Sequence, residues 1–81
     1  MTDEIKNLTA VRSGKQCIFL RLEGGGRRAG RLADIGLIPG QPLRVLQNFG
    51  HGPVTIQVKG SRVALGHGVA RRIIVKDSDH E

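Results

Sequence analysis

The sequence predicts a mainly β domain in which short antiparallel strands curl into a small barrel. Three observations favour this class. The chain has 81 residues, which suffice for one domain with a thin core. Its apolar residues recur mostly at every second position in short runs, the pattern of half-buried strands. Its twelve glycines, about twice the usual share, are spread between those runs as turn residues.

The first strand is expected over residues 16–23, with Ile18, Leu20 and Leu22 facing the core because they alternate with polar or smaller residues. Leu8 and Val11 are spaced three apart and predict a short helical turn before it. Gly24 to Gly26 end the strand. The later elements are strands over 43–49, 54–59, 63–65 and 73–75, a tight hairpin at Gly60-Ser61, and one helical turn over 66–70.

Between the first two strands, the periodicity changes to that of a helix. Apolar and small residues recur at helical spacing from Ala29 to Gly36. We expect Gly36 to end this helix in the left-handed conformation, with Leu37 folding back on Leu32. Pro39-Gly40 then predicts a type II turn, because proline fixes the first φ and glycine accepts the positive second one. This segment is therefore a sharp corner between a helix and a strand.

Hairpin-linked strands of this length cannot form a parallel sheet, but they can close into an antiparallel barrel. The sequence therefore predicts a five-stranded antiparallel SH3-like barrel with one short inserted α-helix. An OB-fold is the alternative at this length. We expect a single domain over residues 1–76, followed by a polar C-terminal tail over 77–81.

The charge and cysteine content restrict partners and compartment. Thirteen Lys and Arg against seven Asp and Glu give a formal net charge of +6, which favours nucleic acid, an anionic membrane face or an acidic protein surface. Cys17 is the single cysteine, so the chain has no internal disulfide and suits a reducing compartment. The first residues carry no apolar signal-peptide core, and no apolar run approaches the roughly 20 residues of a membrane span. We expect a cytoplasmic protein with no membrane span.

Residues suited to catalysis, cofactors or metals are sparse. No nucleophile motif or paired carboxylates appear, so no enzyme is expected. Gly24-x-Gly26-x-x-Ala29 matches a dinucleotide fingerprint in spacing, but no acidic residue follows about 20 positions later, and no cofactor is expected. The soft metal ligands Cys17, His51, His67 and His80 share no metal-binding spacing, so no metal site is expected.

Nucleic-acid binding agrees with the basic charge but lacks stacking residues. Proteins that bind single strands use aromatic platforms, and the only aromatic residues here are Phe19 and Phe49. A stand-alone basic barrel that binds nucleic acid is therefore the second reading of the sequence. Steep salt dependence of binding would distinguish it, because phosphate contacts release counterions.

Spaced motifs run from residue 8 to residue 75. They are Leu8-x-x-Val11-x-x-Gly14, Arg31-Leu32-x-x-Ile35-Gly36-Leu37-x-Pro39-Gly40, Gly52-Pro53-Val54-x-Ile56-x-Val58-x-Gly60, Ala64-Leu65 and Ala70-x-x-Ile73-x-Val75. In this order the motifs resemble the FeoA family of ferrous-iron transport accessory proteins. The resemblance implies an SH3-like barrel that acts as an adaptor beside a FeoB-like membrane Fe(II) transporter with a cytoplasmic GTP-binding domain. It implies no catalytic centre and no cofactor, and it leaves open whether the chain forms a homo-oligomer.

A partner-binding surface is expected on the helix and the corner. Arg27, Arg28 and Arg31 concentrate positive charge on one short element. Leu37 and Ile38 are adjacent large apolar residues at a turn, so only one of them is expected to point inward and the other can serve as an anchor. The strands alternate regularly and are expected to form the scaffold.

Overall fold

Short antiparallel strands and short helices form the fold in a computed structural model that describes residues 4–24 and 27–78. In these ranges the strands are β1 (Ile5–Asn7), β2 (Gln16–Leu22), β3 (Pro42–Gln47), β4 (Val54–Val58), β5 (Ser61–Leu65) and β6 (Ile73–Asp77). The helices are the 3-10 helix η1 (Leu8–Ala10) and the α-helices α1 (Arg27–Asp34) and α2 (His67–Ala70). The mainly β, antiparallel class predicted from the sequence is confirmed, with six described strands where five were expected.

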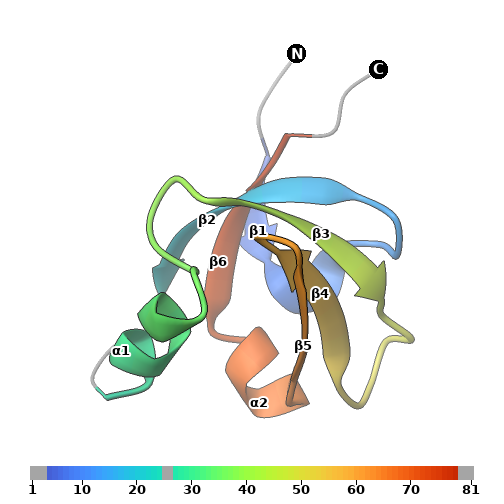
Figure 1. The fold of residues 1–81 in the computed structure, drawn as a ribbon. Coiled ribbons are helices and arrows are strands. Elements are labelled where there is room, and N and C mark those ends of the chain that lie inside the picture. The colour runs from blue at the N-terminus through green and yellow to red at the C-terminus, as the bar shows by residue number, and fades with distance from the viewer. Residues whose placement is uncertain (1–3, 25–26, 79–81) are drawn as a thin grey trace.

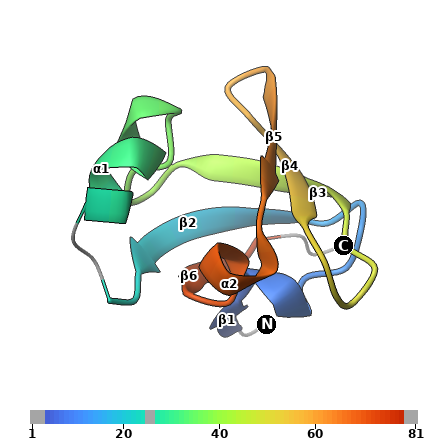
Figure 2. The same ribbon diagram turned by 90° about the horizontal axis from the view of Figure 1, so that it is seen from below.

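The strands form one sheet in the order β1-β6-β2-β3-β4-β5. Figure 1 shows α1 beside one end of β2 and α2 below the sheet, and Figure 2 shows the β4–β5 hairpin turning away from the direction of β2 and β3. Register shifts between Phe19 and Arg21 in β2, and between Val45 and Gln47 in β3, mark irregularities that bend the sheet. The bend allows one sheet to surround the core.

The core collects apolar side chains from β2 to β6, from the three helices and from the corner. In β4, Val54, Ile56 and Val58 are almost completely buried, as their alternation predicted. The buried set is Leu8, Val11, Cys17, Phe19, Leu32, Leu37, Leu43, Val45, Val54, Ile56, Val58, Leu65, Ala70, Ile73 and Val75.

The sequence reading assigned the wrong face of β2 to the core. Cys17 and Phe19 are buried, whereas Ile18 and Leu20 are only half-buried. Both faces of this strand carry apolar residues, so period two alone does not select the inner face. The register shift after Phe19 changes the phase of the strand, and Leu22 then packs against the core although it follows Phe19 by an odd number of residues.

Strand β1 was not predicted, because three residues are too few to show a period. It forms by pairing with β6, with Ile5 opposite Lys76 and Asn7 opposite Ile74. The N–H of Asp77 also donates to the carbonyl oxygen of Glu4 at 2.9 Å. The sheet therefore includes residue 77, where the polar tail was expected to begin.

The β4–β5 hairpin turns at Lys59-Gly60, one residue earlier than expected. Val58 pairs with Ser61, and both turn residues have positive φ, 51° at Lys59 and 80° at Gly60. Two left-handed residues in a two-residue loop are typical of a type I′ turn, whose twist matches that of the strands. The aliphatic stem of Lys59 extends from this turn to Gly36 at the corner.

The corner after α1 has the predicted geometry. Gly36 has a φ of 102°. The N–H of Leu37 donates to the carbonyl oxygen of Leu32 at 2.9 Å, and the N–H of Gly36 donates to the carbonyl oxygen of Ala33 at 3.0 Å. This pair of hydrogen bonds defines a Schellman cap, which satisfies carbonyls that the helix end leaves unpaired. Leu32 and Leu37 both lie in the core, as their predicted contact requires.

Gly36→Val is expected to lower the free energy of unfolding by more than about 1 kcal/mol, because a β-branched residue resists positive φ. A Cβ at this position would also lie 3.1 Å from Cδ of Lys59. Urea denaturation measures the effect. Gly30→Ala is the matched control: it lies within α1, meets no heavy atom within 4 Å, and should stabilise the protein by up to about 1 kcal/mol. Equal stability of Gly36→Val and the parent would contradict the role of the cap.

Candidate functional site

The corner separates its two adjacent apolar residues as expected. Leu37 is 2% exposed and lies in the core, whereas Ile38 is 45% exposed. The turn from Ile38 to Gln41 closes with a 2.9 Å hydrogen bond from the Gln41 N–H to the Ile38 carbonyl oxygen, and Gly40 has a φ of 93°, as in a type II turn. Leu37 therefore supports the corner from inside, and Ile38 is the residue that a partner can reach.

The backbone of the corner is fixed to β2. The N–H of Gly40 donates to the carbonyl oxygen of Phe19 at 2.8 Å, and the N–H of Phe19 donates to the carbonyl oxygen of Gln41 at 2.9 Å. Ile38 is therefore presented on a loop that is hydrogen-bonded to the sheet. A rigid apolar anchor loses little conformational entropy when it binds.

Helix α1, which leads into the corner, carries three arginines. Arg31 is exposed in the last turn of the helix. Arg27 and Arg28 begin the helix, and their side chains lie outside the described residues. We call Arg27, Arg28, Arg31 and Ile38 the corner surface.

A groove of about 370 Å³ lies beside the corner surface. Its lining residues come from α1, the end of β5 and the start of α2, and they are Arg31, Leu32, Ala64, Leu65, Gly66 and Val69. The sequence reading did not identify this groove, because its lining residues are brought together only by the fold. The groove extends the accessible apolar area next to Arg31.

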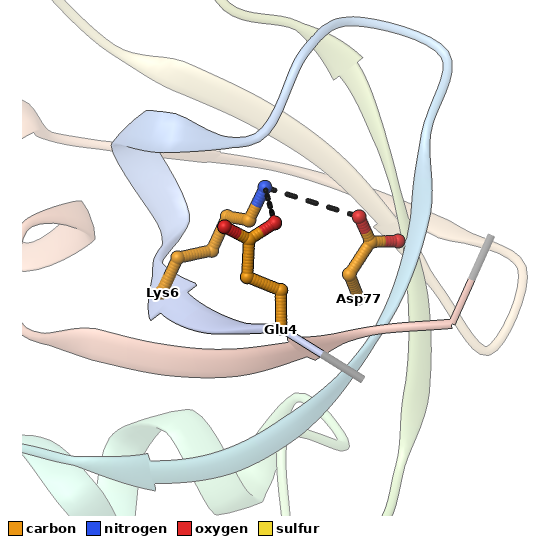
Figure 3. Close-up of polar contacts among 3 residues, drawn as sticks. All are labelled: Glu4, Lys6 and Asp77. Atoms are coloured by element: carbon orange, nitrogen blue, oxygen red, sulfur yellow. Dashed lines mark ion pairs between the residues drawn. The ribbon is translucent and has the colours of Figure 1, made fainter. Parts of the chain in front are cut away.

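A second, more polar pocket of about 260 Å³ lies near the two ends of the chain. It is lined by Lys6, Ala10, Val11, Arg12, Lys15 and Asp77. Figure 3 shows Lys6 between two carboxylates, with its Nζ 3.4 Å from Oε1 of Glu4 and 3.8 Å from Oδ2 of Asp77. Glu4 and Asp77 compensate the positive charge of Lys6, so the excess positive charge of this pocket comes from Arg12 and Lys15. The sequence reading missed the pocket because its residues come from opposite ends of the chain.

The soft metal ligands are not brought together. Cys17 is buried in β2, His51 is exposed in the β3–β4 loop, and His67 is half-buried at the start of α2. His80 lies outside the described residues. Within residues 4–24 and 27–78, no three His, Cys, Asp or Glu side chains are grouped so that they could hold a metal ion.

Cys17 is buried as a neutral thiol. Burial raises its pKa from the ordinary value of 9.0 to about 12; the negative charge of Asp77 adds to the rise, and Lys6 opposes it. A thiol with a raised pKa forms little thiolate and is a poor nucleophile and metal ligand near neutral pH. Cys17 therefore serves the core.

The family model "FeoA domain" matches residues 6–77, which is almost the whole described chain. A candidate Fe(2+) transport protein A from Methanocaldococcus jannaschii is 34% identical over 73 residues, which cover 90% of this chain and 88% of that protein.

Solved structures share the fold. The crystal structure of an iron uptake regulatory protein, FeoA, superimposes with a TM-score of 0.82 at 34% identity and covers 90% of this chain and 99% of that one. FeoA of Stenotrophomonas maltophilia, described as an SH3 domain protein and solved with zinc, has a TM-score of 0.73 at 23% identity and covers 85% of this chain and 87% of that one. The SH3-like class expected from the sequence is thereby confirmed.

The isolated chain is expected to bind neither Fe(II) nor Zn(II) in a stoichiometric site, because its described ligands do not converge. Anaerobic calorimetry with each metal measures this directly. A sub-micromolar isotherm at one metal per chain would contradict the expectation and would return His51, His67 and Cys17 to consideration as ligands.

Cys17 should react with a thiol reagent only after unfolding. Between pH 9 and 12 the folded thiol keeps a proton that the unfolded thiol releases. The contribution of the protonated thiol to the free energy of unfolding is therefore complete below pH 9 and is lost as the pH rises toward 12. Denaturation of the parent and of Cys17→Ala over this range should show a flatter pH dependence for the variant. Rapid labelling of the native protein would be inconsistent with a buried thiol.

Proposed function

The chain belongs to the FeoA family of ferrous-iron transport accessory proteins, and from this membership we propose that it is a cytoplasmic adaptor for a FeoB-like Fe(II) transporter. Such a protein is an accessory rather than an enzyme. No helix in the described part of the chain is long and apolar enough to cross a membrane. The adaptor acts by contacting the transporter's GTP-binding domain through the corner surface.

The observation that carries the proposal is the exposed Ile38 on a hydrogen-bonded corner that directly follows the arginine-bearing helix α1. A partly exposed apolar side chain on rigid backbone has the character of an interface anchor, and a charged element next to it in the chain suits a polar rim. The adjacent groove between α1 and α2 gives a partner further apolar surface.

The positions of Arg27 and Arg28 also support binding by this surface. They begin α1, whose first turn contains no acidic residue. Cations at a helix N-terminus interact unfavourably with the helix dipole, by about 0.3–1 kcal/mol each. Residues that work against the stability of their own helix are expected where another role retains them. Here that role is attraction of an acidic patch on the partner.

Binding of nucleic acid is a second function that the positive charge suggests, and the structure favours it less. Phe19 is buried in the core, so Phe49 is the one aromatic residue that could stack on a base. Binding of successive bases needs more than one such platform.

Ile38→Ala should weaken binding to the GTP-binding domain of the cognate transporter by about tenfold, since an anchor side chain contributes on the order of 1.4 kcal/mol or more. Titration by calorimetry or fluorescence anisotropy measures the affinity. Arg28→Gln/Arg31→Gln should also weaken binding and reduce its salt dependence.

Two variants at the opposite end of the domain are the controls. Phe49→Ala removes another exposed apolar side chain, and Arg12→Gln/Lys15→Gln removes the same charge. Lys59 is unsuitable as a control, because its stem lies against Gly36. If the corner variants are folded and bind as tightly as the controls, the contact surface lies elsewhere.

A further inference from the structure

Phe49 is an exposed aromatic residue in the β3–β4 loop. The second strand predicted from the sequence extended to residue 49, but β3 ends at Gln47 and Phe49 is 72% exposed. Gly50 and Gly52 follow it with positive φ, so the chain turns immediately after this residue. Phe49 is therefore displayed at a turn and takes no part in the core.

Asn48 fixes the backbone that carries Phe49. Its side-chain Nδ2 donates to the carbonyl oxygens of Thr9 at 2.8 Å and Val11 at 2.7 Å, and its N–H donates to Oγ of Ser13 at 2.9 Å. Its Oδ1 accepts a hydrogen bond from the N–H of Gly50 at 3.1 Å. The β3–β4 loop is thus tied to η1 and to the segment that follows it, which contains Arg12.

Three cations at this end of the domain have no acidic partner in the part of the chain that the structure describes. Arg12 is exposed and Lys15 half-buried, and the exposed Arg44 donates to two neutral acceptors, the carbonyl oxygen of Gly14 at 2.7 Å and Oε1 of Gln16 at 3.3 Å. Among residues 4–24 and 27–78, none of the three forms an ion pair. Lys6 lies in the neighbouring pocket, but its charge is opposed by Glu4 and Asp77. We call Phe49, Arg12, Lys15 and Arg44 the loop end.

We propose that the loop end docks on the anionic surface of a lipid bilayer. An aromatic side chain can enter the headgroup region while neighbouring cations remain at the level of the lipid phosphates. Each Lys or Arg near an anionic leaflet adds to the attraction, and the positive charges of the loop end complement that surface. A single exposed aromatic suits insertion between lipids better than stacking on successive bases.

The geometry leaves the corner surface free when the loop end is docked. The corner precedes β3 and Asn48 follows it, and six residues of strand separate the two by about 20 Å. Figures 1 and 2 show α1 and the β3–β4 loop at opposite sides of the molecule. Iron transport takes place at a membrane, so a domain of this family that lies on the bilayer has its corner available to a partner there. The lipid contact itself does not rest on the proposed FeoB-like partner.

The chain contains no tryptophan or tyrosine, so Phe49→Trp introduces a single fluorescent reporter at the site. With vesicles of equal parts phosphatidylglycerol and phosphatidylcholine, its emission should shift to the blue and be quenched by brominated acyl chains. Pure phosphatidylcholine vesicles should cause neither change. Ile38→Trp is the matched reporter at the other end of the domain and should not respond to either vesicle.

Cosedimentation with the same anionic vesicles measures the affinity. Phe49→Ala should bind about tenfold more weakly, because the inserted apolar surface is lost. Arg12→Gln/Lys15→Gln should lose about fivefold per charge. Ile38→Ala and Arg28→Gln/Arg31→Gln, which remove the same kinds of group from the corner surface, should bind as the parent does.

Three results would overturn the proposal. They are no association with anionic vesicles, a fluorescence response at position 38 in place of position 49, and a response of Phe49→Trp to a single-stranded oligonucleotide but not to vesicles. The last would make the loop end a nucleic-acid interface. No transporter is present in these assays, so they remain interpretable whether or not the corner surface binds a FeoB-like domain.

Discussion

The left-handed backbone at Gly36 is the constraint on which the α1 end of the molecule depends. It reverses the chain at the end of the helix, and the two Schellman hydrogen bonds hold that reversal. The reversal sends Leu37 into the core and leaves Ile38 on the surface. The absence of a Cβ also makes room for the stem of Lys59, which brings the β4–β5 turn against the corner. Gly36 therefore determines both the packing of Leu37 in the core and the exposure of Ile38 at the α1 end of the molecule.

The corner could be predicted because its determinants are local. Glycine, proline and apolar spacing between Leu32 and Gln41 are sufficient to specify a cap and a turn. The inner face of β2 could not be predicted, because both of its faces are apolar and a register shift changes their phase. Which of Leu37 and Ile38 faces the solvent was likewise settled only by packing. The loop end was missed because the hydrogen bonds of Asn48 cross 37 and 39 residues of sequence.

A domain of this size acts through its surfaces. Its core is filled mostly by small and medium apolar side chains, and the hollows in its described surface include an open groove and a polar pocket. What the fold provides is a fixed relation between two separate surfaces, since β3 connects the corner to the β3–β4 loop and is hydrogen-bonded to β2 and β4 on its two sides. A rigid strand between the two proposed contact surfaces suits the proposed adaptor role.

The position of β6 between β1 and β2 has a consequence for the order of folding. Both of these early strands pair with the last one. During synthesis, β1 and the edge of β2 that faces β6 must therefore wait until residues 73–77 have been made. The hairpin of β4 and β5 and the cap of α1 need only nearby residues and can form earlier. Native pairing of such distant segments slows folding, and a nascent chain that stops short of residue 73 leaves β1 without its described partner and β2 paired only with β3.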